Sequence, residues 1–526
     1  MRFPRVNRFA VLLLLAGIAS GAAAQGAESA DAPALYRTHC AACHGADRLG
    51  GSGPALLPEN LTRLKRPKAA KAIAEGLPAS QMPGFEAQLS GEEVAALVEL
   101  IYTPLPVVPR WGRAEIAASR VTVTSPGSLP AAPVHKADPL NLFVVVEMGD
   151  HHVTILDGDR FEPITRFPSR YALHGGPKFS PDGRFVYFAS RDGWITKYDL
   201  FGLKVVAEVR AGINTRNLAI SHDGRVVAVA NYLPHTLVLL DAGDLAPLEV
   251  RTVKDFRGKT TSRVSAVYQA APRESFVVAL KDVPEIWEIS YAKEPPAIYS
   301  GFVHNYEKGM EEALPATGSF PVRRIDLKEP LDDFFFTPKY NALIGSTRDS
   351  GRAVVVNLDV RREIAELPLP GLPHLGSGIS WLRDGRRIMA TPHIKQGLIS
   401  VIDLEDWRVI KSIETLGPGF FLRSHEKSRY AWTDVFFGPN REVVHVIDKQ
   451  TLEIAATLRP APGKTAGHVE FTRDGRYALV SIWDMDGAIV VYDAETLEEV
   501  KRIPFVKPSG KYNVYNKIHL SEGTSH

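Results

Sequence analysis

Most of the chain alternates short apolar segments with polar turns. From about residue 134 onward, β-rich segments recur, each ending near an Asp and many opening on an Asp-Gly or equivalent turn, which is the pattern of consecutive β-strands. Eight such segments occur, at residues 143–161, 180–200, 221–242, 272–291, 337–359, 383–404, 425–448 and 472–493.

The turn that opens these segments is itself repeated. Its clearest copies are Ser180-Pro181-Asp182-Gly183-Arg184, Ser221-His222-Asp223-Gly224-Arg225, Arg383-Asp384-Gly385-Arg386 and Arg473-Asp474-Gly475-Arg476. Asp182 and Asp223 lie 41 positions apart, and Asp384 and Asp474 lie 90 apart, or two units of 45. Periods of roughly 40 to 50 residues with several short strands per unit indicate propeller blades. We therefore predict an all-β eight-bladed propeller over residues 134–526, with residues 292–321 as an excursion from one blade.

The region before the repeats has helical periodicity. Ser90 and Glu93 form a capping box at the start of a helix. The apolar side chains of that helix share one face, and they are Val94, Leu97, Val98 and Ile101. Three prolines then interrupt the pattern, at positions 104, 106 and 109. We expect a small all-α domain at residues 25–103 and a stiff linker at residues 104–133.

The first 24 residues have the pattern of a secretory signal. Arg2, Arg5 and Arg8 precede an apolar run at residues 9–19, and three alanines at 22–24 come before Gln25. The run has about eleven residues, whereas a membrane span needs roughly 20, so an uncleaved anchor is the weaker alternative. No later segment has the pattern of a membrane span. We expect a cleaved signal and a periplasmic protein.

The length, net charge and cysteine count of the chain exclude several classes of protein. The chain has 526 residues, 45% of them hydrophobic, which is enough for two or three domains. Its 62 Lys and Arg against 60 Asp and Glu give a formal net charge of +2, so we expect no nucleic-acid partner. Only Cys40 and Cys43 are present, which excludes a scaffold of several disulfides.

The two cysteines lie in Cys40-Ala41-Ala42-Cys43-His44. Cys-x-x-Cys-His is the attachment pattern of a covalent haem c, in which both sulfurs bind the macrocycle and the histidine binds the iron. A thioredoxin-like pair is the competing interpretation, but no βαβ pattern surrounds the motif. Met82, in Gln81-Met82-Pro83-Gly84, is the predicted sixth iron ligand, with His39 as its rival. The helical domain is thus predicted to be a c-type cytochrome.

Three further segments resemble the cytochrome cd1 family, in which a c-type cytochrome is fused to an eight-bladed propeller that holds haem d1. They are Tyr171-Ala172-Leu173-His174, Leu372-Pro373-His374-Leu375-Gly376 and Lys507-Pro508-Ser509-Gly510-Lys511-Tyr512-Asn513-Val514-Tyr515-Asn516. The resemblance covers essentially the whole chain after residue 24. It implies that a non-covalent tetrapyrrole, haem d1 or dihydro-haem d1, binds the propeller.

The resemblance also implies roles for individual side chains. His174 resembles the proximal ligand of the haem d1 iron, and His374 a histidine on the distal face, although a hydrogen-bonded core histidine is the alternative for each and the expected state of His393. Carboxylates of the macrocycle call for arginine partners. The candidates, for which a surface location is the alternative, are Arg191, Arg216, Arg263 and Arg348. Trp483 is expected either to stack on the ring or to pack within a blade.

One position departs from the nitrite reductases of this family. Asp332 stands where they place a second distal histidine. Nitrite reduction consumes protons, and an ionised carboxylate repels nitrite. An efficient nitrite reductase is therefore the alternative rather than the preferred function.

The closer resemblance is to the dihydro-haem d1 dehydrogenases, oxidoreductases of haem d1 biosynthesis. It implies that a propionate side chain becomes an acrylate while electrons leave through haem c, with His468 or His374 as the base. A blade-edge histidine bonded to backbone is the alternative for His468. A periplasmic electron acceptor is implied, and nitrite reductase and haem d1 maturation proteins are candidate partners. A non-catalytic haem d1 carrier is the third hypothesis, but a carrier would not need an attached haem c.

Overall fold

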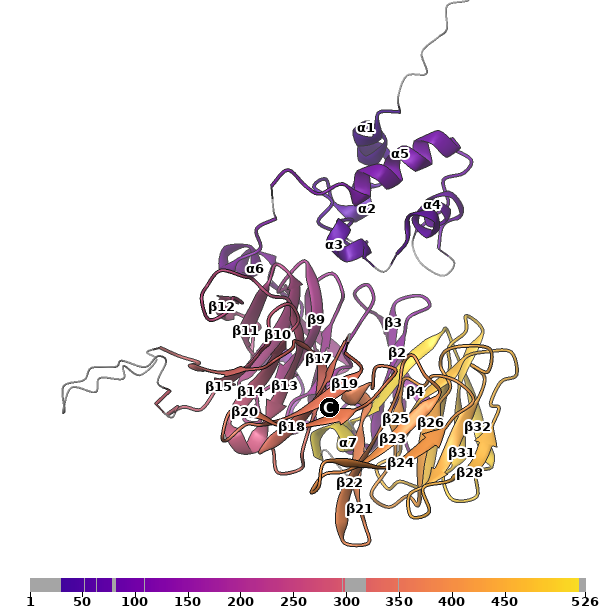
Figure 1. Cartoon of the computed structure of the whole chain (residues 1–526). Helices are drawn as coiled ribbons and strands as arrows, with labels where there is room; N and C mark the ends of the chain where they lie inside the picture. Colours follow the sequence, from indigo (N-terminus) through magenta and orange to yellow (C-terminus); the bar gives the residue numbers. More distant parts are fainter. Residues whose placement is uncertain are drawn as a thin grey trace, which may run out of the picture.

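The computed structural model describes residues 30–51, 53–62, 64–77, 82–107, 109–295, 297–298, 318–348 and 350–519. The expected signal at residues 1–24 lies outside this part of the chain. Figure 1 shows a group of helices on one side of a larger ring of sheets. Within the described ranges, no helix has both the length and the apolar character required to cross a bilayer.

The helical unit is built around one capped helix. Its elements are α1 (Ala32–His39), α2 (Ala41–His44), α3 (Pro58–Leu61), α4 (Arg66–Glu75) and α5 (Gly91–Tyr102). At the start of α5, Ser90 Oγ accepts from the Glu93 amide at 3.2 Å, and Glu93 Oε2 accepts from the Ser90 amide at 2.7 Å, as the capping box predicts. The four predicted apolar side chains of α5 are all buried, and they pack with Tyr36 of α1 in one core.

Eight antiparallel sheets of four or five strands form a propeller, so the predicted fold is confirmed. The first strands of neighbouring blades contact one another around the centre. In each blade the strands are given from the innermost outward.

The first three blades are β33 (Pro508–Asn513), β2 (Leu142–Glu147), β3 (His152–Asp157) and β4 (Glu162–Pro168); β5 (Lys178–Phe179), β6 (Phe185–Ala189), β7 (Trp194–Asp199) and β8 (Lys204–Arg210); and β9 (Asn214–Ile220), β10 (Val226–Leu233), β11 (Thr236–Asp241) and β12 (Pro247–Thr252). The next three are β13 (Val264–Ala270), β14 (Ser275–Leu280), β15 (Glu285–Ser290) and β16 (Val322–Asp326); β17 (Leu331–Phe336), β18 (Ala342–Thr347), β19 (Arg352–Asn357) and β20 (Arg362–Pro368); and β21 (Ile379–Arg383), β22 (Arg386–Pro392), β23 (Leu398–Asp403) and β24 (Arg408–Glu414). The last two are β25 (Leu422–Arg423), β26 (Tyr430–Asp434), β27 (Val444–Asp448) and β28 (Ile454–Leu458); and β29 (Ala466–Phe471), β30 (Tyr477–Ile482), β31 (Gly487–Asp493) and β32 (Glu499–Phe505).

The repeated Asp-Gly turn joins the first and second strands of a blade. Between β5 and β6, Ser180 Oγ donates to Asp182 Oδ1 at 2.5 Å and accepts from the Phe185 amide at 2.9 Å. Gly183 has a φ of +72°, which favours glycine at this position. The predicted excursion at residues 292–321 lies between β15 and β16, and most of it is outside the described residues.

The ring closes by pairing the last strand of the chain with one of the first. In the innermost strand β33, Asn513 lies opposite Phe143 of β2, and Tyr512 lies opposite Val144. The helix α7 (Val514–His519) follows directly. Residues from both ends of the propeller sequence are therefore neighbours at its centre.

The predicted linker has regular structure of its own. Within residues 104–133, α6 (Arg113–Ser119) and β1 (Val121–Thr122) occur, and β1 pairs with β8 as a fifth strand at the outer edge of that blade. Trp111 Nε1 donates to the Arg210 carbonyl at 2.7 Å. The proline pattern did not reveal this docking, because a two-residue strand carries too little periodicity to be predicted.

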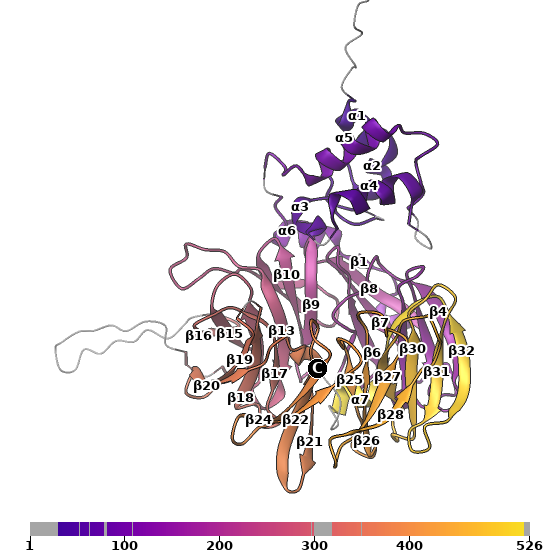
Figure 2. The ribbon, with the colours of Figure 1, turned by 45° about the vertical axis from the view of Figure 1, so that its right-hand side comes forward.

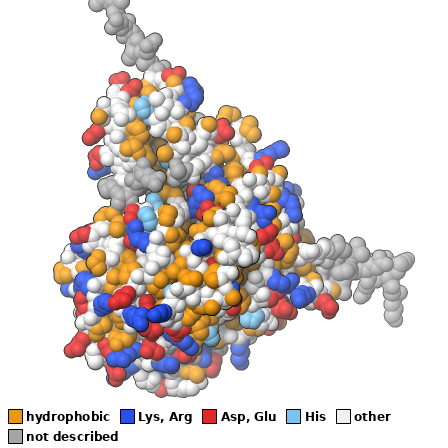
Figure 3. Space-filling view, turned by 180° about the vertical axis from the view of Figure 1, so that it is seen from behind, with side chains coloured by type: hydrophobic (Ala, Val, Ile, Leu, Met, Phe, Trp, Pro, Cys, Tyr) orange, Lys and Arg blue, Asp and Glu red, His pale blue; other side chains and the backbone are white. Residues whose placement is uncertain are grey.

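The cytochrome unit packs directly on the propeller. Ala55 and Leu57 form a buried apolar cluster with Ile213 and Leu233 of the propeller. Arg210 also donates a hydrogen bond to the Leu49 carbonyl. Figure 2 shows the helices over the β9–β10 side of the ring, and Figure 3 shows basic and acidic side chains interspersed over the propeller surface.

Ring closure can be tested with a core substitution. Phe143 is fully buried between the closing blade and the last one, so Phe143→Ala should lower the free energy of unfolding by about 3–5 kcal/mol. The matched control is Phe256→Ala, because Phe256 is 68% exposed and should cost under about 0.5 kcal/mol. Urea unfolding followed by circular dichroism measures both. Equal midpoints for the two variants would contradict the packing described here.

Candidate functional site

The Cys-x-x-Cys-His motif forms the end of α1 and all of α2. Cys40 ends α1 and begins α2, which brings Cys43 and His44 onto the following turn. His44 Nδ1 hydrogen-bonds the Pro54 carbonyl at 2.8 Å, so Nδ1 carries the proton and Nε2 keeps its lone pair. A Cβ at Gly53 would lie 2.9 Å from the His44 ring, so glycine is needed at this close approach.

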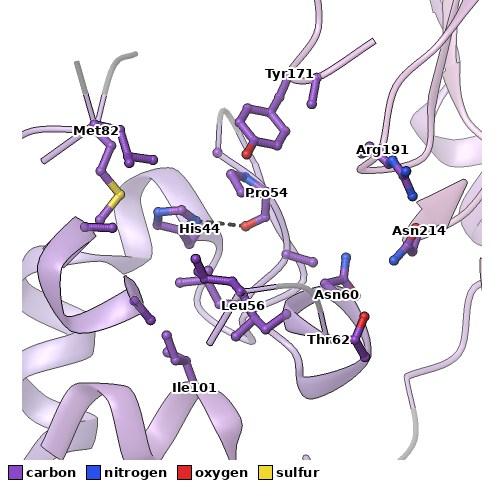
Figure 4. A pocket seen from close by; sticks show the side chains of 18 of the residues that line it. His44, Pro54, Leu56, Asn60, Thr62, Met82, Ile101, Tyr171, Arg191 and Asn214 are labelled. Carbon is purple, nitrogen blue, oxygen red and sulfur yellow. Dashed lines mark hydrogen bonds between the residues drawn. The ribbon is translucent and has the colours of Figure 1, made fainter. Parts of the chain in front are cut away.

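Met82 lies across the same cavity from His44. Figure 4 shows the Met82 side chain with its sulfur directed toward the His44 ring. Two thiols on one turn, an oriented imidazole and a facing thioether are the donor set of a covalent haem c, and the residues therefore fit this group. The rival ligand, His39, also lines the cavity, with its ring edge-on to Phe85 at 5.7 Å.

This cavity extends into the propeller. It has a volume of about 1730 Å³ and is lined by the cytochrome motif and by propeller residues, including Tyr171, His174 and Arg191. A second cavity of about 200 Å³ shares His174 with it and is also lined by His374 and His468. The larger cavity therefore contains the cytochrome motif together with His174 of the propeller, and the smaller cavity adjoins it at shared lining residues; the two together are called the hollow. Tyr171 lies between the cytochrome motif and Arg191 (Figure 4).

His174 is held by two arginines of neighbouring elements. Its Nδ1 hydrogen-bonds the Arg216 carbonyl at 2.7 Å, so the lone pair is on Nε2, to which Arg191 Nη2 donates at 2.8 Å. Arg216 Nη1 lies 3.2 Å from the same Nε2 atom. The predicted proximal ligand and two predicted carboxylate partners are therefore in direct contact.

His374 is oriented in the same manner on the other side of the smaller cavity. Its Nδ1 hydrogen-bonds the Phe420 carbonyl at 2.6 Å, and its ring stacks on Phe420 at 4.2 Å. Burial lowers the pKa of His374, so the ring is neutral near pH 7. A short 3₁₀ helix, Leu375–Ser377, follows directly and ends the loop.

His468 occupies a strained position in β29. Its φ is +51°, in the left-handed region, at a register shift between Gly467 and Glu470. The Nε2 atom is buried without a hydrogen-bond partner, and Nδ1 accepts a long hydrogen bond from the Lys511 amide at 3.4 Å, which favours the neutral tautomer with its proton on Nε2. Burial, and then the charges of Lys511 and Arg423, lower the pKa of His468 well below its usual value.

Asp434 connects the two candidate catalytic histidines from behind the cavity. Its Oδ1 accepts from the amides of Phe420 and Phe421 at 2.7 and 3.1 Å, and its Oδ2 accepts from the His468 amide at 3.2 Å. Burial raises the pKa of this carboxyl to about 6. Asp434 thus positions the carbonyl and ring that orient His374 as well as the backbone of His468.

Two further residues line the smaller cavity and were not predicted as site residues. Tyr512 lies edge-on to His468, with ring centroids 4.9 Å apart, and burial raises its pKa to about 12, so it is a neutral hydrogen-bond donor. It lies within the C-terminal segment that resembles the family, which was the available signal. Arg423 also lines this cavity. Neither Arg423 nor Asp434 lies in a sequence motif that would have identified it.

The remaining arginine candidates are engaged at the rim. Arg263 pairs with Asp282, with Nη2 to Oδ1 at 2.5 Å and Nε to Oδ2 at 2.9 Å, although it lines the larger cavity. Arg348 and Lys281 both bind Asp332 Oδ1, at 2.5 and 2.6 Å. Burial raises the pKa of Asp332, but these two cations outweigh that effect and hold it at about 2.

Asp332 is therefore paired with two side chains that line the larger cavity. Its charge is balanced by two cations, and it is absent from the described residues that line either cavity. His393, as expected, is a core side chain held by the Pro370 carbonyl and by Ser400 Oγ at 2.9 Å. Trp483 lines both cavities and packs edge-on to Phe436 at 4.7 Å.

Two protein families match the chain. The family described as "Cytochrome D1 heme domain" matches residues 137–305 and 315–517, and the family described as "Cytochrome C oxidase, cbb3-type, subunit III" matches residues 27–101.

Two relatives and one solved structure illustrate what the chain is similar to. The chain is 60% identical over 513 residues to "Dihydro-heme d1 dehydrogenase" of Pseudomonas aeruginosa, covering 98% of this chain and 99% of that protein. It is 23% identical over 539 residues to "Nitrite reductase" of Stutzerimonas stutzeri, covering 92% of each. It is similar to the solved structure "Dihydro-heme d1 dehydrogenase NirN in complex with DHE", with a TM-score of 0.85 and 60% identity over 92% of this chain and 99% of that one.

The positioning by Asp434 generates a prediction. Asp434→Ala leaves three buried amides without an acceptor and should lower the free energy of unfolding by about 3 kcal/mol. Asp434→Asn retains one carbonyl oxygen for Phe420 and Phe421 but turns an N–H₂ group toward the His468 amide, so it should cost less. Urea unfolding compares both with Asp486→Asn, in which the altered side chain is 79% exposed. Equal stability of the alanine variant and this control would refute the role of Asp434.

Proposed function

Because the chain belongs to the cytochrome D1 haem domain family, we propose that it is a dihydro-haem d1 dehydrogenase, which oxidises a propionate side chain of the bound tetrapyrrole to an acrylate. One observation carries the proposal: the haem c motif and the histidine-lined propeller site open into a single hollow. An electron released at the propeller therefore has a short path to the cytochrome without leaving the protein.

The reaction defines what the side chains must do. When CH₂–CH₂ becomes CH=CH, one C–H bond on each carbon breaks, and two protons and two electrons leave. Haem c, when attached through Cys40 and Cys43 and ligated by His44 and Met82, accepts electrons one at a time. His174 and His374 would hold the iron of the tetrapyrrole substrate, because Nδ1 of each bonds a backbone carbonyl and leaves the lone pair on Nε2. At His174 the iron would take the place of the hydrogen bond from Arg191.

His468 removes a proton from the reacting side chain, and Tyr512 assists it as a hydrogen-bond donor. A buried, neutral imidazole can accept a proton at the ring nitrogen that carries its lone pair, and the neighbouring phenol can donate a hydrogen bond to the reacting side chain. His374 is the second candidate base. Arg191, Arg216 and Arg263 bind peripheral carboxylates of the macrocycle, for which guanidinium groups are suited.

The two other functions have less support. A nitrite reductase would need distal proton donors, whereas Asp332 is an ionised carboxylate paired with Lys281 and Arg348. The relative named for nitrite reduction is also 23% identical, against 60% for the relative named for dehydrogenation. A protein that only carries haem d1 would not require the haem c attachment residues around His44.

The proposal extends to the location and partners of the protein. The positive segment, apolar run and alanine site at residues 1–24 support export to the periplasm. A periplasmic one-electron acceptor would reoxidise haem c. Nitrite reductase, which uses haem d1, and haem d1 maturation proteins are the proposed partners for delivery and release of the tetrapyrrole.

Adding dihydro-haem d1 to the oxidised, haem c-loaded protein tests the function. The tetrapyrrole spectrum should shift to that of haem d1 while haem c becomes reduced, with two electrons per macrocycle once an acceptor is present. Binding without conversion would leave only the carrier function. Rapid nitric oxide formation from nitrite and a donor would favour the nitrite reductase.

Single substitutions separate binding from conversion. His468→Asn should slow single-turnover conversion by about 10²- to 10⁴-fold with little change in tetrapyrrole affinity, because a base is lost. His174→Ala should instead weaken tetrapyrrole binding. His222→Asn, in an exposed turn, is the control. If His468→Asn converted the substrate at the wild-type rate, His468 would not be the base.

The pH profile provides a further test. A lowered pKa keeps His468 in its basic form at every pH above that value, so activity is lost only when the pH falls through it. Single-turnover conversion should therefore stay level from about pH 8 down to the usual histidine pKa of about 6.5. A loss of activity centred at or above about pH 6.5 would contradict a buried neutral histidine as the base.

A further inference from the structure

Arg423 is a buried cation without an anion. It ends the innermost strand β25 and is 4% exposed. Its Nη1 donates to the carbonyl of its own neighbour Leu422 at 2.8 Å, and its Nε is buried with no hydrogen-bond partner. Among the described residues, no carboxylate lies within ion-pair distance of it.

A buried guanidinium without an anion destabilises the folded protein unless another group replaces its lost hydration. A guanidinium removed from water loses its hydration, and burial accordingly lowers the pKa of Arg423, with Glu470 and Asp434 acting on it only at longer range. The other buried arginines of the pocket have partners: Arg216 donates to the Ser265 carbonyl at 3.2 Å and contacts His174. Arg423 therefore differs from Arg216 in that its buried Nε has no hydrogen-bond acceptor.

The side of the Arg423 guanidinium that makes no hydrogen bond faces the proposed reaction site. Arg423 lines the smaller cavity together with His374, His468 and Tyr512. Its charge acts on all three: burial lowers the pKa of His374 and of His468 and the Arg423 charge lowers both further, whereas burial raises the pKa of Tyr512 and the same charge opposes that rise. An anion at Arg423 would thus be adjacent to the candidate base and the phenol.

We propose that Arg423 binds the carboxylate of the propionate side chain that is dehydrogenated, and so directs its two methylene groups toward His468 and Tyr512. This inference rests on the proposed dehydrogenation. A planar guanidinium with Nε and Nη2 available can bind both oxygens of a carboxylate, which fixes the plane of the side chain. Neutralising that carboxylate also makes loss of a proton from the adjacent carbon easier, because the developing negative charge is no longer opposed by an anion.

The two-electron balance is unchanged by this contact. Each methylene loses one hydrogen, the C=C bond forms, one proton passes to His468, and the second leaves the site. The two electrons reach haem c singly and continue to an external one-electron acceptor. Arg423 binds the carboxylate throughout and is neither oxidised nor deprotonated.

Variants of the full-length, haem c-loaded protein test the inference. Titration with dihydro-haem d1 should give a Kd about 10- to 100-fold higher for Arg423→Gln than for wild type, the range typical of a lost charge-assisted bond. At saturating tetrapyrrole, single-turnover conversion should fall as well, because the reacting side chain is no longer held. Arg423→Lys should recover part of the affinity, since it restores the charge but not the two-point contact. Arg386→Gln is the control, because Arg386 pairs with Asp403 and Asp406 away from the cavities.

Stability distinguishes substrate binding from a structural role. Arg423→Met removes a buried charge at similar volume, so the tetrapyrrole-free variant should unfold at a temperature equal to or above that of wild type. A lower unfolding temperature combined with normal tetrapyrrole affinity would overturn the inference and make Arg423 structural.

The kinetic outcomes separate this inference from the proposed function. Weakened affinity with a full single-turnover rate would place Arg423 on a carboxylate away from the reacting side chain, which also overturns the inference. If wild type converts dihydro-haem d1 and Arg423→Gln binds and converts it equally well, the inference fails alone. If wild type binds the compound without converting it, the proposed dehydrogenation fails, and with it the reactive role of Arg423.

Discussion

The pairing of β33 with β2 is the interaction on which the site depends. It closes the ring and sets Tyr512 of the last strand beside His468 of the preceding blade. Because β33 is the innermost strand of its blade, its side chains reach the central cavity rather than solvent. The imidazole of His468, the phenol of Tyr512 and the backbone amide of Lys511 are thus placed together by a contact between distant parts of the sequence.

The histidines of the hollow fall into two groups by their hydrogen bonds. In His44, His174 and His374, Nδ1 is bound to a backbone carbonyl, which fixes the tautomer and leaves the lone pair on Nε2. These are the three histidines proposed to bind iron. The ring of His468 differs, because its Nδ1 accepts from the Lys511 amide at 3.4 Å. The backbone hydrogen bonds therefore distinguish the three proposed ligands from the proposed base.

The fold could be predicted because its signals are local and repeated. The Asp-Gly turns gave the eight blades, and Ser90 with Glu93 gave the start of α5. His174, His374 and His468 could be found because their flanking residues resemble the family, which the family match confirms. Arg423 and Asp434 could not, because their importance arises from burial and from contacts across blades. The docking of β1 on β8 was missed for the same reason, and the roles of individual site residues remain predictions.

The docking of α6 and β1 along one blade has a kinetic consequence. Because the connection to the cytochrome is fastened to β8, the cytochrome cannot move far from the hollow. Exchange of electrons between the two sites is then a first-order event, whose rate does not depend on protein concentration or on a diffusional encounter. Dilution should slow only the delivery of tetrapyrrole and the departure of electrons to the outside.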